Sequence, residues 1–397
     1  VAFDKAYKAE IETLVQQGLE AEEAKKQAPI LLKAQEMLLA WEQNDPKVLA
    51  LWEKMNNWVF DGFAKSYAQM GVSFDKIYRE SNTYLLGKKL VDEGLTQGVF
   101  FRKNDGSVWI DLSEEGLDEK LVLRRDGTSV YITQDMGTAQ LKYEDFGAKR
   151  SIYVVGNEQD YHFEVLFHIL KKLNKPFSEG NYHLSYGMVD LPSGKMKSRE
   201  GTVVDADDLM AEMVNTAQNR TMELGKIDGF SAEESDALFN QLGLGALKYF
   251  LLKVDPKKRM LFNPEESIDF QGNTGPFIQY THARICSMTR KAATLGIDMQ
   301  ISPSESYNLA ASEQELIYLL GSYKSKIKEA AEQFAPSVIA QFTYDLAKQF
   351  NKFYNELSIL NEENEYSRNI RLNLAALTGE TIKASLSLLG IVAPDRM

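Results

Sequence analysis

Residues 191–202, LPSGKMKSREGT, hold side chains that could bind phosphate. Lys195, Lys197 and Arg199 lie among small residues between two glycines. Mobile cations beside a bound nucleotide can neutralise the negative charge that builds up on a departing pyrophosphate. A solvated basic turn would need the same residue types and no function, so this stretch alone leaves both interpretations open.

A second candidate site combines acidic and phenolic side chains. Tyr131 and Asp135 are four residues apart in SVYITQDMGTAQL, where we expect a strand to meet a helix, and Glu80 lies in RESNTY. A buried carboxylate beside a tyrosine hydroxyl suits a guanidinium or ammonium ligand, since carboxylates pair bidentately with guanidinium groups. Helix capping or a surface ion pair is the alternative interpretation of each residue.

The length and composition indicate a soluble globular protein of two or three domains. The chain has 397 residues, of which 44% are hydrophobic and 26% are charged, and domains usually contain roughly 100 to 200 residues. The net charge of −12 argues against a globally basic nucleic-acid binder but leaves a local basic patch possible.

Cysteine usage and the chain ends limit the cellular setting. Cys286 is the only cysteine and there are four histidines, so we expect no disulfide framework, no CxxC-type zinc site and no protein-held metal. A reducing, cytoplasmic location is the default, and the sequence has neither a long apolar run nor a signal core, so we expect no membrane span. Because the chain opens with Val1 inside a helical pattern, we expect it to be part of a longer protein.

The N-terminal 70 residues have a helical pattern. Apolar residues recur at helical spacing over 1–70, with a break near Pro29. Asp45 followed by Pro46 predicts the start of a long helix, and Gly71 predicts its end. The aromatic stripe of this helix is best explained by packing in a core.

The middle of the chain predicts an α/β fold. Short β-type runs over 98–133, the last of them VYIT, are separated by Asp-Gly turns and predict an antiparallel β insertion. Over 151–205, the strand SIYVVG, the helix YHFEVLFHILKKL and the strand HLSYGMVDL form one β/α/β unit, the second half of a nucleotide-binding sheet. A helical connector follows over 206–242, and Asp205 is expected to cap its first helix. Ligands of such sheets bind at the C-terminal ends of the parallel strands.

The last part of the chain, 243–397, reads as all-α and predicts a helical bundle. The expected fold class is therefore α/β followed by all-α, with a boundary after residue 242. Residues 245–300 contain eight Lys and Arg against five Asp and Glu, a local balance of +3 within an acidic chain. A basic patch of this kind suits nucleic-acid binding.

Six segments of the sequence, taken in order, together resemble arginyl-tRNA synthetase, a class I aminoacyl-tRNA synthetase. The segments are YITQDMGTA, IYVVGNEQDYHFEVLF, SYGMV, GKMKSREGTVV, TGPFIQYTHARICSMTRKA and LGIVAPDRM. The resemblance implies a partial class I (Rossmann-like) nucleotide-binding sheet with helical and β insertions, followed by an anticodon-binding bundle. The family's His-x-Gly-His motif and its N-terminal tRNA-contacting domain are not found in this sequence, so we expect the C-terminal portion of the enzyme.

The resemblance gives the phosphate-binding stretch a role. Lys195, Met196, Lys197, Ser198 and Arg199 stand at the five positions of the family's KMSKS signature, which implies that Lys195 holds the ATP phosphates. Ser198 occupies the place of the second signature lysine. Either Lys197 or Arg199 is then expected to supply the missing cation.

The resemblance also implies binding residues for the two small substrates. The expected arginine ligands are Tyr131, Asp135, Gln159 and Glu80. The expected ATP-binding residues, beside Lys195, are Gly156, His162, Gly187, Met188 and Val189.

For tRNA, the resemblance implies contacts from the bundle by Gln279, Tyr280, Arg284, Tyr354 and Met397. Aromatic side chains beside cations suit unpaired anticodon bases, which are bound by stacking. Packing in the bundle core explains either tyrosine equally well.

The implied function is ATP-dependent activation of L-arginine and its transfer to tRNA(Arg), with Mg²⁺ accompanying ATP. We expect a cytoplasmic monomer, and a portion that is inactive alone. Two alternatives stay open, namely a tRNA-binding fragment with no catalysis of its own and a small-molecule nucleotidyltransferase of the same superfamily.

Overall fold

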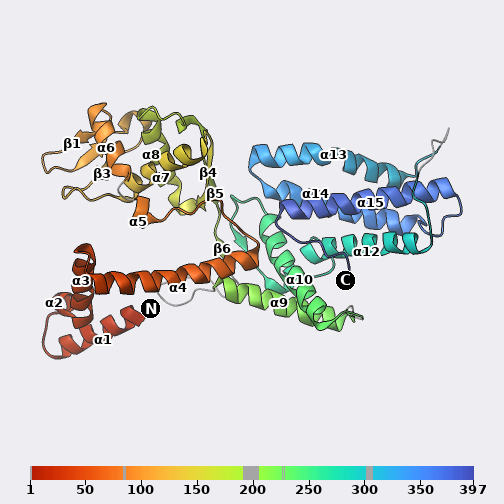
Figure 1. The fold of residues 1–397 in the computed structure, drawn as a ribbon, viewed down its shortest axis with the longest axis horizontal. Helices are drawn as coiled ribbons and strands as arrows, with labels where there is room; N and C mark the ends of the chain where they lie inside the picture. The colour runs from red at the N-terminus through yellow and green to blue at the C-terminus, as the bar shows by residue number, and fades with distance from the viewer. Residues whose placement is uncertain (1, 84–85, 191–204, 226, 228, 301–306) are drawn as a thin grey trace. The chain divides into compact units, whose positions relative to one another are not determined.

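The computed structural model of the chain describes residues 2–83, 86–190, 205–225, 227, 229–300 and 307–397 (Figure 1). These residues divide into two compact units. One unit comprises the described residues of 1–73 and 193–212, and the other comprises those of 74–192 and 213–397.

The first unit is built largely from helices, as the apolar spacing predicts. They are α1 (Ala2–Gln16), α2 (Ala21–Gln27), α3 (Pro29–Glu42) and α4 (Pro46–Met70). The predicted break near Pro29 is confirmed, and a second break separates α1 from α2. Both predicted ends of α4 are confirmed, because the Asp45 carboxylate accepts hydrogen bonds from the first-turn amides of Lys47 and Val48 at 2.9 and 3.0 Å and Gly71 adopts a left-handed φ of 67°.

The aromatic stripe of α4 does not pack into a core. None of the α4 residues is buried, and Trp52 and Phe63 of the stripe are 39% and 52% exposed. The prediction of core packing was therefore wrong for these residues. Helical spacing predicts an apolar face, but it does not say whether another element covers that face.

The second unit begins with two helices and a small sheet. They are α5 (Glu80–Thr83), α6 (Leu86–Thr96), β1 (Phe101–Arg102), β2 (Val108–Ile110) and β3 (Lys120–Leu123). The three strands form an antiparallel sheet in the order β1-β2-β3, which confirms the predicted β insertion over these residues. Its inner face packs around one apolar core with α6, α7 (Tyr131–Phe146) and α8 (Asp160–Lys172).

The run VYIT is helical rather than extended. Tyr131 is the first residue of α7 (Tyr131–Phe146), so the expectation of a β-run there was wrong. The Thr133 hydroxyl accepts a hydrogen bond from the Val130 amide at 3.3 Å and donates one to the Val122 carbonyl. These two bonds start a helix within a β-branched sequence that by itself favours a strand.

The predicted β/α/β unit is confirmed. Strands β4 (Ser151–Gly156) and β5 (Asn181–Tyr186) are parallel and paired from Ser151↔Asn181 to Gly156↔Tyr186. The 3₁₀ turn η2 (Asn157–Gln159) and helix α8 (Asp160–Lys172) connect them, with a further turn, η3 (Ser178–Gly180), before β5. The apolar face of α8 lies in the same core as α7.

HLSYGMVDL is two strands rather than one. After β5 ends at Tyr186, β6 (Val189–Asp190) pairs in parallel with β7 (Met260–Leu261) in a separate ladder. Gly187 causes the break, because its amide donates to the Pro256 carbonyl at 2.8 Å. A Cβ at this position would lie 2.5 Å from the carbonyl carbon and oxygen of Lys258.

The remainder is helical, as predicted. The helices are α9 (Ala206–Glu223), α10 (Ala232–Leu252), α11 (Pro264–Ser267), α12 (Gly275–Thr294), α13 (Ala311–Gln333), α14 (Pro336–Glu356) and α15 (Glu365–Leu388). Helix α12 packs with α14 and α15 around a core that includes Ile285, Phe350 and Ile382 (Figure 1). The boundary predicted after residue 242 falls inside α10, whose N-terminus is fixed by a capping box of Ser231 and Glu234.

Among the helices of the described residues, none has the length and apolar character needed to cross a bilayer.

An aromatic contact joins the sheet to the bundle within the second unit. Phe334, the C-cap of α13, has a left-handed φ of 52°, and its ring stacks on Tyr182 of β5 with centroids 4.4 Å apart. The Arg150 guanidinium lies 5.1 Å from the Phe334 ring centre. A strand of the α/β part is therefore anchored directly to the helical part.

We expect Gly187→Ala to destabilise the second unit, because the added methyl group would overlap the Lys258 backbone, which cannot move as a flexible side chain would. Overpacking of this kind costs about 1 to 3 kcal/mol. Urea unfolding followed by circular dichroism measures the change. Gly321→Ala on α13 is the matched control, because a Cβ there meets nothing within 4 Å and should stabilise the helix by up to about 1 kcal/mol. Equal stability of Gly187→Ala and the wild type would contradict the steric explanation.

Candidate functional site

The C-terminal ends of β4 and β5 form the edge where ligands are expected. Gly156 ends β4 opposite Tyr186, and Gly187 follows β5 directly. Gly187 is buried, whereas the next side chain, Met188, is 42% exposed. Val189 is half-buried in β6. Four of the residues predicted to bind adenosine thus lie at or directly after the C-terminal ends of β4 and β5, namely Gly156, Gly187, Met188 and Val189.

The connection after β4 brings two further predicted residues to the same edge. Gln159 is exposed at the end of η2, and His162 lies in the first turn of α8. The His183 ring of β5 lies 4.4 Å from the ring of Phe163, centre to centre, and its Nε2 lies 3.0 Å from the Val155 carbonyl oxygen. His183 therefore contacts the first turn of α8.

The predicted arginine ligands of α7 meet this edge through one short hydrogen bond. Asp135 Oδ2 lies 2.6 Å from His162 Nε2, so a residue predicted for arginine contacts one predicted for ATP. Tyr131 is one helical turn earlier on α7. The expectation of a buried carboxylate was wrong, because the Asp135 side chain is 42% exposed and Tyr131 is 76% exposed. Both groups are thus accessible to a ligand from solvent.

Glu80, the fourth predicted arginine ligand, is exposed at the first residue of α5. This short helix packs against α7, which places Glu80 in the neighbourhood of the Asp135 helix. Its role as a ligand stays a prediction. The three predicted catalytic residues Lys195, Lys197 and Arg199 lie outside the described residues.

Two residues beside Asp135 were not predicted from the sequence. Tyr153 of β4 has a buried hydroxyl oxygen for which the described residues supply no hydrogen-bond partner, and Lys142 Nζ lies 4.1 Å from the Tyr153 ring centre. Burial, and secondarily the Asp135 charge, raises the pKa of Tyr153 to about 12. Burial lowers the pKa of Lys142, against the opposing effect of Asp135. Because Tyr153 lies within the apolar run SIYVVG, its sequence context indicates only a core residue.

A second cluster lies on the bundle. The Arg284 guanidinium of α12 lies between two tyrosine rings, 4.9 Å from the centre of Tyr280 and 5.2 Å from that of Tyr354. Its NH1 donates to Asn351 Oδ1 at 2.6 Å, and the Tyr354 side chain is 39% exposed. Three of the residues predicted to contact tRNA therefore form one cationic and aromatic cluster.

Gln279 has a different role from the predicted one. Its side chain is fully buried, and its amide nitrogen donates to the carbonyls of Gln241 at 3.0 Å and Val392 at 2.7 Å. Direct contact with tRNA does not fit this position, because two backbone groups already use the amide and solvent cannot reach it. Gln279 instead holds the C-terminal segment, which ends at the half-buried Met397.

Known families match both parts of the chain. The catalytic domain of tRNA synthetases class I (R) matches residues 4–263, and the DALR anticodon binding domain matches residues 278–397. Curated relatives include the arginine–tRNA ligases of Bacteroides thetaiotaomicron, 56% identical over 397 residues, and of Flavobacterium psychrophilum, 57% identical over 398 residues. Both alignments cover 100% of this chain but only 66% and 65% of the relative, so the chain spans about two thirds of their length.

Solved structures share the fold. The arginyl-tRNA synthetase of Plasmodium falciparum superimposes with a TM-score of 0.79 at 22% identity, covering 95% of this chain and 63% of its own. The Thermus thermophilus arginyl-tRNA synthetase superimposes with a TM-score of 0.77 at 23% identity, and the match covers 99% of this chain and 74% of that structure's chain. A methionyl-tRNA synthetase of Mycobacterium tuberculosis superimposes with a TM-score of 0.57 at 14% identity, and the match covers 83% of this chain and 76% of that structure's chain. These likenesses confirm the predicted fold class.

The raised pKa of Tyr153 predicts a pH dependence of stability. An ordinary tyrosine titrates near 10.0 and folded Tyr153 near about 12, so folding favours its protonated form. Its contribution is complete below pH 10 and is lost as the pH rises toward 12. Phenylalanine cannot ionise, so the free energy of unfolding of Tyr153→Phe should fall less between pH 10 and pH 12 than that of the wild type. We expect a difference between the two decreases on the order of 2 kcal/mol.

Urea unfolding on both sides of pH 10 measures this difference. Tyr318→Phe is the control, because that side chain is 78% exposed on α13 and should leave the pH profile of the wild type unchanged. Parallel profiles for the wild type and Tyr153→Phe would contradict the assignment.

Proposed function

The chain belongs to the arginyl-tRNA synthetase family of class I aminoacyl-tRNA synthetases, and from this premise we propose that it forms the arginine-binding and tRNA-binding parts of an arginine–tRNA ligase. Because the chain spans about two thirds of the length of its relatives, the proposal concerns the activity of the complete enzyme. The observation that carries it is the contact between Asp135 and His162 at the C-terminal ends of parallel strands. There, a ligand for a guanidinium group meets the edge where a nucleotide is expected.

In the proposed first step, the arginine carboxylate attacks the α-phosphate of ATP and pyrophosphate leaves. The Asp135 carboxylate and the Tyr131 hydroxyl bind the guanidinium group, and Gln159 and Glu80 contribute further polar contacts. His162 and the backbone from Gly156 onward adjoin the adenosine. Arginine and ATP are thereby held together without a covalent intermediate on the protein, so that positioning supplies much of the rate.

The phosphate end of ATP is assigned to the signature residues. Lys195 holds the phosphates as charge develops on the leaving pyrophosphate, and either Lys197 or Arg199 replaces the second signature lysine. Mg²⁺ enters with ATP as part of the substrate complex. The Gly187, Met188 and Val189 segment completes the proposed ATP-binding set.

In the second step, the activated arginine is transferred to the terminal ribose of tRNA(Arg). We assign anticodon recognition to the cluster of Tyr280, Arg284 and Tyr354 on α12 and α14. A guanidinium between two aromatic rings supplies a positive charge for phosphate and an exposed face for base stacking. Met397 stays a proposed contact of this region. We further propose that the protein works as a monomer in the cytoplasm.

A tRNA-binding fragment with no catalysis of its own is the second candidate, because about one third of the length of the relatives lies outside the part that this chain covers. Pyrophosphate exchange by the purified chain distinguishes the two candidates: activity would show that the chain is sufficient, and its absence together with tRNA binding would favour the fragment. A small-molecule nucleotidyltransferase has no need of an anticodon-binding domain, which disfavours that third alternative.

We expect Asp135→Asn in the complete enzyme to raise the KM for arginine while changing the KM for ATP much less. The substitution keeps the shape of the side chain but removes the charge that pairs with guanidinium. A charge-assisted hydrogen bond of this kind contributes about 1.5 to 3 kcal/mol, equivalent to roughly 10-fold to 100-fold in affinity. Arginine-dependent pyrophosphate exchange at varied arginine and ATP concentrations measures both constants.

The matched control is Asp160→Asn, the same change at an exposed carboxylate 3.4 Å from His183 Nδ1. It should leave the KM for arginine near the wild-type value. Equal losses for arginine and ATP in Asp135→Asn would show that Asp135 maintains the structure rather than binding arginine.

We expect Tyr354→Ala to weaken binding of tRNA(Arg) by this chain. Loss of one base-stacking platform costs about 1 to 3 kcal/mol, or on the order of 10-fold in Kd.

Arg284→Ala should weaken tRNA(Arg) binding as well and reduce the dependence of that binding on salt, since a phosphate contact releases counterions. Filter binding or fluorescence anisotropy at several salt concentrations measures both effects.

Tyr318→Ala serves as the control, because it removes another exposed tyrosine of the bundle. Its affinity for tRNA(Arg) should match that of the wild type. If Tyr354→Ala and Tyr318→Ala bound tRNA(Arg) equally well, the anticodon-binding role of the cluster would be wrong.

A further inference from the structure

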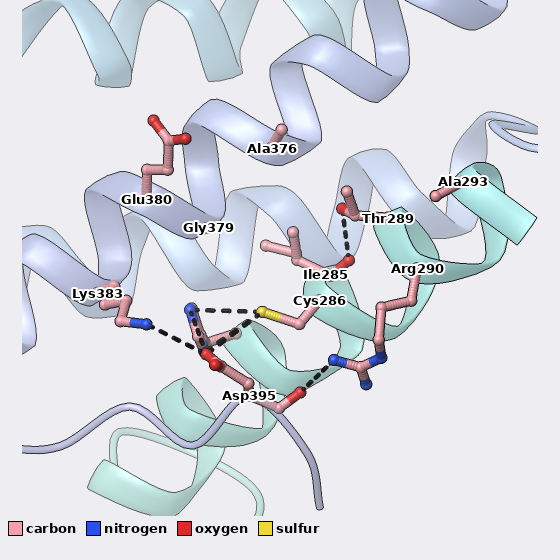
Figure 2. A pocket seen from close by; sticks show the side chains of 11 residues that line it. Ile285, Cys286, Thr289, Arg290, Ala293, Ala376, Gly379, Glu380, Lys383 and Asp395 are labelled. Atoms are coloured by element: carbon pink, nitrogen blue, oxygen red, sulfur yellow. Dashed lines mark hydrogen bonds and ion pairs between the residues drawn. The ribbon is translucent and has the colours of Figure 1, made fainter. Parts of the chain in front are cut away.

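A pocket of about 430 Å³ lies between α12, α15 and the C-terminal segment, on the bundle (Figure 2). Three of its lining residues are His282 and Cys286 of α12 and Asp395 of the segment after α15. Their potential ligand atoms all lie within 4.8 Å of one another. None of these three residues is used by the proposed aminoacylation site.

The three ligand atoms form a nearly regular triangle. Cys286 Sγ lies 3.6 Å from His282 Nε2 and 3.9 Å from Asp395 Oδ1, and His282 Nε2 lies 4.0 Å from Asp395 Oδ1. With zinc–ligand bonds of about 2.0 to 2.3 Å, neighbouring ligands of a tetrahedral ion are roughly 3.3 to 3.7 Å apart. Contraction by a few tenths of an ångström would therefore place all three atoms around one ion.

The orientation of His282 also suits a metal ligand. Its ring is 2% exposed, and Nδ1 lies 3.0 Å from the Pro394 carbonyl oxygen. Because a carbonyl only accepts, Nδ1 carries the hydrogen, and the lone pair of the neutral ring is left on Nε2. Nε2 is the ring nitrogen nearer to Cys286 Sγ, at 3.6 Å against 3.9 Å for Nδ1, and it lies 4.0 Å from Asp395 Oδ1. A backbone carbonyl that fixes the tautomer in this way is the usual outer-shell partner of a metal-binding histidine.

Two basic side chains surround Asp395. Lys383 Nζ lies 3.3 Å from Asp395 Oδ1, and Arg290 NH1 donates to the Asp395 carbonyl at 3.0 Å (Figure 2). A divalent cation would compete with Lys383 for the same carboxylate oxygen. The Lys383 side chain is 58% exposed, so it can turn into solvent at small cost when an ion binds.

We propose that His282, Cys286 and Asp395 bind one Zn²⁺ ion, with a water molecule from the pocket as the fourth ligand. Imidazole, thiolate and carboxylate are all ligands of zinc, whereas the thiolate disfavours magnesium and calcium. One thiolate and one carboxylate balance the double charge of the ion. Sequence spacing gave no sign of this set, because Cys286 and Asp395 are 109 residues apart, and the expectation of no protein-held metal rested on the lack of a CxxC pair.

The ion would fasten the C-terminal segment to α12. Hydrogen bonds from Lys248 to Gly390 O at 2.6 Å and from Gln279 to Val392 O at 2.7 Å already hold this segment, and zinc would add a bond to Asp395. Helix α12 also carries Arg284, between the two ligands in sequence. Zinc would therefore steady the helix on which the proposed anticodon cluster is built.

Cobalt substitution tests the proposal directly. The purified 397-residue chain, stripped with a chelator and kept reduced, is titrated with Co²⁺ and then with Zn²⁺. We expect one ion per chain, a thiolate-to-cobalt charge-transfer band that Zn²⁺ abolishes, and a rise in Tm with Zn²⁺ because the ion binds the folded state. Cys286→Ser and Asp395→Asn should each weaken Zn²⁺ binding by roughly 100-fold or more, at least the effect of losing an outer-shell partner.

Two variants of the same pocket complete the experiment. Lys383→Ala removes the competing cation and should tighten Zn²⁺ binding, whereas Glu380→Gln removes a carboxylate that lines the pocket outside the group of three and should leave it unchanged. Circular dichroism verifies the fold of each variant. If Cys286→Ser does not fold, the exposed Asp395→Asn and the charge-transfer band decide. Absence of the band, or Zn²⁺ affinity unaffected by Asp395→Asn, would overturn the proposal.

Discussion

The approach of the Gly187 backbone to the Lys258 backbone is the constraint on which the arrangement of the second unit depends. It ends β5 at the edge where ligands are expected and directs the chain into β6, which pairs with β7. Arg259, the residue after Lys258, forms a bidentate ion pair with Asp190 of β6. Because β7 follows α10, one tight backbone contact ties the nucleotide-binding edge to the helical part.

The contact of Phe334 with Tyr182 joins the same two parts at a second place. A phenylalanine in the left-handed region costs on the order of 1 kcal/mol, and the stacked ring and the Arg150 guanidinium offset this cost. Two separate junctions resist relative rotation better than one. The second unit therefore presents the Asp135–His162 contact and the Tyr280–Arg284–Tyr354 cluster on one connected scaffold.

Local patterns in the sequence were sufficient for most elements and for several positions in the site. The β4–α8–β5 unit was predicted because its apolar periodicity changes clearly from strand to helix and back. The prediction failed at VYIT, where Thr133 makes hydrogen bonds that start a helix, and at α4, whose apolar face is left exposed. At the site, Asp135 and His162 were both predicted, but their contact was not. Contacts between distant segments, such as Gln279 with Val392 or Tyr153 with Lys142, leave no periodic signal in a single sequence.

Cys286 provides a single site at which a thiol-specific reagent can modify this chain. It is the only cysteine of the sequence, and burial, followed by the nearby Asp395 carboxylate, raises the pKa of its thiol. The thiolate is therefore scarce near neutral pH, and alkylating reagents will react slowly with Cys286 although it lines a pocket. Because no other thiol competes, the rate of alkylation reports on the surroundings of this one position of the bundle, without the removal of other cysteines or the introduction of a fluorophore site.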